Sequence, residues 1–177
     1  MSKKIAVAAL VIILVLVNWF IHDKEKHLAE GRIVYLELAP VDPRSLMQGD
    51  YMDLRFEMAR KLLNALPRTK KGREQPDEAA AEDGFVVVRL DKRNIGSFQA
   101  LYKDQPLSEN EIIMRYRVRS KRVRFATNAF FFQERHAKYY EPARYGCFRV
   151  NDDGDLLLTG LYDENLDKLG PPEPQKS

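Results

Sequence analysis

The chain has 177 residues, of which 45% are hydrophobic and 31% are charged, which is the composition of a folded globular protein. Its formal net charge of +3 is too small to favour a nucleic-acid-binding protein. The only cysteine is Cys147, which excludes an intramolecular disulfide. We predict that Cys147 is a small buried residue, and an intermolecular disulfide is the alternative.

The N-terminal segment predicts a membrane-spanning helix. Residues 5–21 carry no charge and one strongly polar side chain, Asn18. A bilayer span needs about 20 apolar residues, with a lower limit near 17. Trp19 and Phe20 lie at the far end, where an interfacial aromatic anchor is expected. No small-residue cleavage site follows, which favours an uncleaved signal anchor over a cleaved signal peptide. A buried core helix is the third alternative.

The charges around this run predict its orientation. Lys3 and Lys4 precede it, whereas the cations that follow it are interleaved with acids. The positive-inside tendency therefore places the N-terminus in the cytoplasm and the rest of the chain outside the inner (cell) membrane, on its periplasmic or extracytoplasmic side. The predicted segments are an n-region at 1–4, the anchor at 5–21 and a helical stalk at 22–31.

The remainder predicts one domain over residues 32–169. Short β-branched and aromatic runs recur between turn residues, and one stretch, 58–66, has helical spacing before Pro67. This pattern predicts a mostly β, antiparallel sandwich or barrel-like domain with one short helix. The predicted strands are 33–38, 51–58, 85–90, 96–102, 112–125, 130–132, 147–150 and 156–162.

Three polar segments interrupt or end this domain. Residues 68–84 are rich in charge, with a basic half and then an acidic half, and predict a mobile insertion. Residues 151–155 predict a hairpin turn between the last two strands. The proline-rich residues 170–177 predict a disordered tail.

The most distinctive segment is a proline-containing turn that leads into a glycine, an aspartate and an alternating strand. Gly49 permits a positive φ, and Asp50 can fix the turn through its downstream backbone. Tyr51 and Leu54 then start the strand on opposite faces. The segment is either a structural turn or part of a surface cluster of arginine–carboxylate pairs. The residues of that cluster would be Asp42, Arg44, Asp50, Glu134 and Arg144.

Residues 49–56 resemble the name string of the GDYXXLXY family. Later blocks at 130–134 and 140–145, including Tyr145, are also similar to that family. The resemblance implies a small, membrane-anchored bacterial protein without an assigned activity, associated with multi-pass membrane proteins. Phe56 replaces the final tyrosine of the string, so we predict no polar role for it. Arg135 stands where the resemblance would lead us to expect glycine.

A basic stripe is the second distinctive feature. Every other residue from 115 to 121 is a cation, and the period of two of a strand places them all on one face. Like charges stacked in this way repel one another unless they are screened. The stripe is either a solvated face paired with acids or a binding face for envelope anions, such as lipid headgroups or acidic glycans. Its residues are Arg115, Arg117, Arg119 and Lys121.

No pattern in the sequence favours a metal site, a cofactor or a catalytic constellation. We therefore predict a non-enzymatic accessory module that docks on an integral membrane protein, without cofactor or nucleic acid. The alternative is a binding module for envelope anions through the basic stripe. A third hypothesis is a hydrolase built on Asp42, Asp50 and Glu134.

Overall fold

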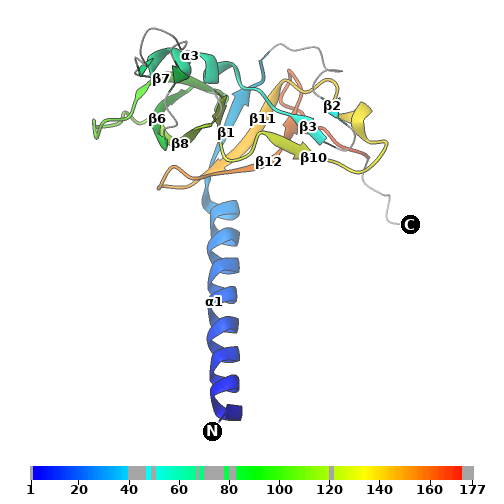
Figure 1. The fold of residues 1–177 in the computed structure, drawn as a ribbon. Helices are drawn as coiled ribbons and strands as arrows, with labels where there is room; N and C mark the ends of the chain where they lie inside the picture. The colour runs from blue at the N-terminus through cyan, green and yellow to red at the C-terminus, as the bar shows by residue number, and fades with distance from the viewer. Residues whose placement is uncertain are drawn as a thin grey trace.

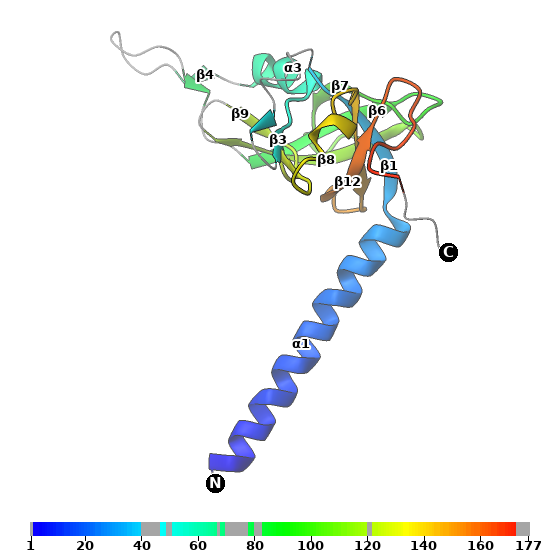
Figure 2. The ribbon, with the colours of Figure 1, turned by 90° about the vertical axis from the view of Figure 1, so that its right-hand side faces the viewer.

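The computed structural model describes residues 2–39, 47–48, 51–66, 68–69, 78–79, 83–119 and 122–172. A long helix, α1 (Ser2–Glu30), carries a mostly β domain at its C-terminal end (Figure 1). The view at right angles shows that the domain overhangs the helix to one side (Figure 2). The predicted fold class, a mostly β domain with one short helix behind an apolar N-terminal helix, is confirmed.

Helix α1 includes both the apolar run and the predicted stalk. Its window of highest mean hydropathy, 2.6, has none of its residues buried, so the apolar side chains pack against no other described part of the chain. The amide of Asn18 donates to the Leu14 carbonyl (2.8 Å), so this polar side chain has a hydrogen-bond partner within the helix. The helix is long and apolar enough to span a membrane, a test that a signal sequence also passes.

The strands pair in antiparallel sheets. Three strands form one sheet in the order β1-β11-β12, and four form another in the order β7-β6-β8-β9. A small sheet has the order β10-β3-β2, and β4 pairs with β5. The bounds are β1 (Arg32–Glu37), β2 (Met47–Gln48), β3 (Tyr51–Asp53), β4 (Arg68–Thr69), β5 (Glu78–Ala79), β6 (Asp83–Leu90), β7 (Gly96–Leu101), β8 (Glu111–Arg119), β9 (Arg122–Arg124), β10 (Ala129–Phe131), β11 (Tyr145–Val150) and β12 (Leu156–Tyr162).

One hydrophobic core joins these sheets. A parallel bridge between Tyr35 and Ile95 connects β1 to the edge of the four-stranded sheet. Helix α3 (Glu57–Ala65) buries Met58 and Leu62 in the same core. A 3-10 turn (Ala137–Tyr139) lies between β10 and β11. Cys147 is buried in β11, as predicted.

The predicted strand at 51–58 is only partly correct. Strand β3 ends at Asp53, and the extended backbone continues to a bridge between Phe56 and Leu38 before α3 begins at Glu57. Burial nevertheless alternates over the whole segment, because the first buried residue of the helix, Met58, continues the period of the extended part. Alternation alone therefore could not locate the end of the strand.

The predicted strand at 112–125 is in fact a hairpin. Strand β8 ends at Arg119, and β9 begins at Arg122 and runs back beside it. Directly opposed residues of an antiparallel pair point to the same face. Arg122 therefore lies on the face of Arg119, whereas a continuous strand would place it on the opposite face.

The polar segments fall partly within the described residues. Asn151 forms the predicted hairpin turn by accepting from the Asp155 amide (2.8 Å), and Gly154 adopts a positive φ of 76°. Strand β6 begins at Asp83, inside the predicted insertion. Most of that insertion, and residues 173–177 of the predicted tail, lie outside the described residues.

Two tyrosines beside Cys147 predict an alkaline limit to stability. Tyr35, which is the cross-strand neighbour of Cys147, meets Tyr162 edge to face, and their ring centroids are 5.2 Å apart. Burial, and next the neighbouring Cys147 thiol, raise the pKa of both phenols above the ordinary value of 10.0. The unfolded phenols therefore ionise first, and the stability present below pH 10.0 is lost as the pH rises through the folded pKa.

The midpoint of urea unfolding, measured as the pH is raised from below 10.0, should fall less in Tyr35→Phe/Tyr162→Phe than in the wild type. An equal fall would contradict the assignment of this alkaline loss to the two phenols.

Candidate functional site

Hydrogen bonds join the end of helix α1 to the domain. The His27 ring donates through Nε2 to the Arg149 carbonyl (2.9 Å), and the Arg149 guanidinium donates to the Gly31 carbonyl (2.9 Å). His27 is only 6% exposed, and its Nδ1 is buried without a partner among the described residues. These contacts fix the position of strand β11, and hence of the domain, relative to the last turn of the helix.

The hairpin β8–β9 presents arginines on its outer face. Met114, Tyr116 and Val118 point into the core, so the alternate residues of β8 point outward, as the stripe predicted. The register sets Arg117 opposite Arg124 and Arg119 opposite Arg122. We call this surface the arginine face, and its members are Arg115, Arg117, Arg119, Arg122 and Arg124.

Three of the five arginines have acidic partners. Arg115 pairs with Asp155 (3.2 Å) and lies over the Phe85 ring (5.2 Å to its centroid). Arg119 pairs with Asp83 (2.7 Å), and Arg122 with Asp53 (3.4 Å). Arg117 and Arg124, which oppose each other, form no ion pair within the described residues, although Asp83 of β6, which Arg119 holds, is the other cross-strand neighbour of Arg117. Like charges directly opposite each other destabilise a sheet.

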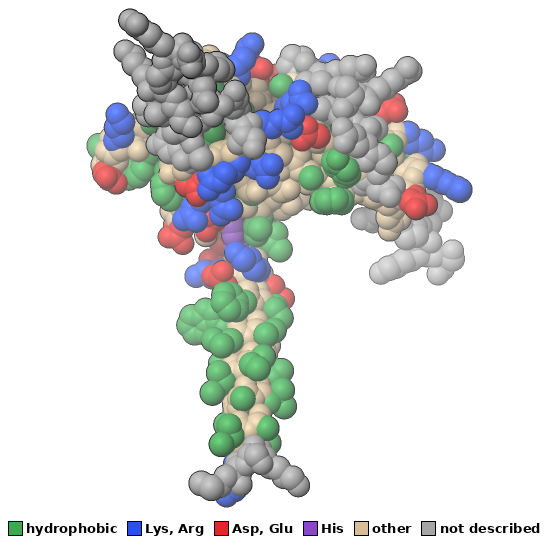
Figure 3. All heavy atoms as spheres, in the orientation of Figure 1, with side chains coloured by type: hydrophobic (Ala, Val, Ile, Leu, Met, Phe, Trp, Pro, Cys, Tyr) green, Lys and Arg blue, Asp and Glu red, His purple; other side chains and the backbone are tan. Residues whose placement is uncertain are grey.

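A hollow of about 250 Å³ separates this hairpin from helix α1. Figure 3 shows Lys and Arg side chains on the domain surface just above the apolar part of the helix. Among the described residues that line the hollow, Asp155 is the only acid, and it already pairs with Arg115. We call this space the basic hollow, and its lining residues are Lys24, His27, Arg115, Arg117, Arg124, Ala126, Asp155, Leu156 and Leu157.

The motif strand is linked to the arginine face by an acid that the sequence analysis did not select. The Asp53 carboxylate in β3 pairs with Arg55 (3.5 Å) and with Arg122 of β9 (3.4 Å). Leu54 is fully buried, and Phe56 packs edge to face against Phe125 and Phe148. The motif therefore contributes core side chains and one bridging carboxylate.

The motif also leads to an aromatic pair of which one member is exposed. Tyr51 in β3 opposes Phe131 in β10, and their ring centroids are 5.8 Å apart. Phe131 is 73% exposed, more than any other large hydrophobic side chain described outside α1. An exposed aromatic side chain of this size is typical of a contact surface for a partner.

Only two residues of the predicted arginine–carboxylate cluster, Glu134 and Arg144, lie within the described part of the chain. Asp42, Arg44, Gly49 and Asp50 lie outside the described residues, as does Lys121 of the stripe. Glu134 and Arg144 are both exposed, and no ion pair between them is found in the described part of the chain. The backbone of Arg144 joins two other segments: its amide donates to the Tyr162 carbonyl, and its carbonyl accepts from the Leu38 amide (both 2.8 Å). Tyr145 begins strand β11.

The family model of the GDYXXLXY protein matches residues 13–161. The chain belongs to the GDYXXLXY family. No curated protein and no solved structure matches the chain. The match includes the motif strand, the arginine face and the β strands as far as Leu161 in β12. The family model therefore covers nearly the whole β domain and not only the residues of the name string.

Proposed function

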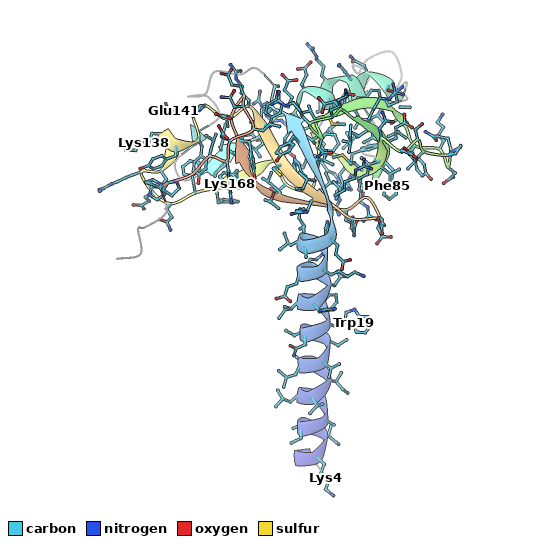
Figure 4. All side chains as sticks on the ribbon, turned by 180° about the vertical axis from the view of Figure 1, so that it is seen from behind. Lys4, Trp19, Phe85, Lys138, Glu141 and Lys168 are labelled. Carbon is cyan, nitrogen blue, oxygen red and sulfur yellow. The ribbon has the colours of Figure 1, made fainter. Side chains whose placement is uncertain are left out.

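We propose that this GDYXXLXY protein is a membrane-anchored accessory module that acts without catalysis by docking on an integral membrane protein. Helix α1 is the anchor, with its N-terminus in the cytoplasm and the β domain in the periplasm. The bare apolar surface of α1 supports an anchored helix, because a surface of this kind is stable only in lipid or against a partner. Trp19 projects sideways from the helix at a height suited to an interfacial anchor (Figure 4).

The observation that carries the docking proposal is the exposed Phe131 beside Tyr51. The small sheet β10-β3-β2 lies on the part of the domain that overhangs α1 to one side (Figure 1). A membrane protein packed beside α1 would have its extracytoplasmic loops next to this overhang. Burial of Phe131 by such a loop would stabilise the complex, because aromatic anchors contribute strongly at interfaces.

The docking proposal predicts a partner that depends on Phe131. Affinity purification of the full-length protein from its native membranes in mild detergent should retain one membrane protein in stoichiometric amount. Phe131→Ala should reduce its recovery at least tenfold, since losing an interface anchor costs about 2 kcal/mol or more. Mass spectrometry identifies the partner and measures the ratio.

Leu107→Ala is the matched control for this experiment. Leu107 is the other large exposed hydrophobic residue described in the domain, at 40%, and it does not lie in β3 or β10. Its substitution should leave the recovered partner unchanged. A wild-type preparation without any stoichiometric membrane protein would refute docking.

A second candidate function, the binding of an anion from the cell envelope, is favoured by one observation. Arg117 and Arg124 oppose each other beside the basic hollow without an acidic partner among the described residues. An arrangement that repels in isolation is stabilised when an anion is bound between the two guanidinium groups.

A further inference from the structure

The basic hollow lies at the height of lipid headgroups. The apolar run ends at Ile21, and the stalk residues that line the hollow are Lys24 and His27. A rise of about 1.5 Å per residue places them roughly 5 Å and 9 Å beyond the end of this run. The headgroup layer on each side of a bilayer is about 5–7 Å thick, so the entrance to the hollow meets this layer.

We propose that the basic hollow binds the headgroup of an anionic phospholipid of the membrane that α1 enters. This inference rests on the second candidate function and specifies its ligand. Guanidinium groups bind phosphate oxygens through paired hydrogen bonds, and Arg117 and Arg124 present two such groups side by side. Lys24 adds a third cation from the helix itself.

The charges that already pair within the hollow leave this site open to an anion. Asp155, the one acid among its described lining residues, is held by Arg115 at 3.2 Å. Arg115 in turn covers Phe85, which lies on the side of the domain facing the helix (Figure 4). The ion pair is neutral as a unit, and Lys24 lies 3.9 Å from Asp23, so the excess positive charge comes from Arg117 and Arg124.

A second hollow beside α1 is different and supplies a control. This larger hollow of about 490 Å³ includes Lys26 and Arg32, but also five acids. Those acids are Asp23, Glu30, Glu111, Asp152 and Asp153. An anionic headgroup is therefore repelled from this hollow, although both hollows adjoin the last turns of α1 and share His27.

The test measures amide hydrogen exchange in the β8–β9 hairpin of the full-length protein in lipid nanodiscs. Discs of phosphatidylcholine alone are compared with discs that also contain phosphatidylglycerol. A bound anionic headgroup should slow exchange in the hairpin at least fivefold, because each cation near an anionic surface contributes about fivefold to association. The effect should diminish at high salt.

Arg117→Gln/Arg124→Gln should change exchange in opposite ways in the two lipids. In phosphatidylcholine the hairpin should exchange about twofold more slowly than in the wild type, because the repulsion is removed. Adding phosphatidylglycerol should then have no further effect. A purely structural role for these arginines predicts faster exchange in both lipids. The matched control Lys26→Gln/Arg32→Gln removes the same charge from the acid-rich hollow and should respond as the wild type does.

Whether the anion belongs to the membrane is tested by moving the hollow away from the headgroup layer. Seven helix-forming residues inserted between His22 and Asp23 lift it by about 10 Å and nearly preserve its direction, because they add about two turns. The inserted protein should lose the response to phosphatidylglycerol.

The outcomes separate the headgroup site from anion binding in general. If inorganic pyrophosphate slows exchange in phosphatidylcholine discs and phosphatidylglycerol does not, the lipid proposal fails and the second candidate function stands. If the inserted protein still responds to the lipid, the height argument is overturned. If neither the lipid nor pyrophosphate slows exchange in the wild type, both the proposal and the candidate function fail.

Discussion

Phe56→Ala should lower the midpoint of thermal unfolding of the domain by roughly 10 °C, since a buried Phe→Ala change costs about 3–5 kcal/mol. Phe56 is 3% exposed and contacts Phe125 and Phe148 edge to face, at centroid distances of 6.0 Å and 5.5 Å. It also bridges Leu38 of the extended segment after β1. Its removal leaves a cavity where segments distant in the sequence meet. Circular dichroism of the full-length protein in neutral detergent measures the shift.

The matched control for Phe56→Ala is Phe131→Ala. The chemical change is the same, but Phe131 is exposed and lies at the edge of a small sheet. We expect its unfolding midpoint to fall by no more than about 2 °C, since exposed substitutions usually cost under about 0.5 kcal/mol. Equal shifts in the two variants would show that the motif aromatic is not a core residue.

Gly154→Ala should destabilise the domain by about 1–2 kcal/mol, because an L-residue is strained in the left-handed region. Gly154 has a φ of 76°, and an added Cβ would lie 3.2 Å from the Ile113 carbonyl oxygen. Its own carbonyl accepts from the Arg115 amide (2.8 Å), so the turn is bonded to β8. We expect the unfolding midpoint to fall by roughly 4 °C, as measured by the same circular dichroism.

Gly160→Ala provides the comparison for this strain. Gly160 lies in β12, and a Cβ there would meet its nearest atom at an ordinary 3.5 Å. Because its φ is not positive, alanine fits its backbone and should leave the midpoint unchanged or slightly raised. A loss in Gly160→Ala as large as that in Gly154→Ala would exclude backbone strain as the cause.

The sequence predicted local features of this fold well. An uninterrupted apolar run identified α1, and the strands at 33–38 and 85–90 followed from β-branched and aromatic residues. The hairpin turn that includes Gly154 followed from its composition. These features depend on neighbours in the chain, so their signals are carried by short segments.

Features that depend on pairing between segments could not be predicted in the same way. A turn within the run 112–125 reverses the chain and brings Arg122 and Arg124 to the face of Arg117 and Arg119. The period of two contains no information about such a reversal. Only the pairing of β8 with β9 shows it, and the same pairing brings Arg122 within reach of Asp53 in β3. The basic hollow was missed because it also requires α1.

Under the proposed anchoring, the hydrogen-bonded junction between α1 and β11 would determine how the domain responds to the bilayer. A flexible linker would let the domain rotate freely, but His27, Gly31 and Arg149 hold it to the last turn of the helix. A tilt of the helix therefore becomes an equal tilt of the domain, with one edge moving toward the lipid and the other away. Spans longer than the hydrocarbon layer tilt, whereas short ones thin the bilayer or stay upright. With its short apolar run, the proposed anchor would stay near upright, and the junction would hold the arginines and Phe131 at a nearly constant angle to the membrane surface.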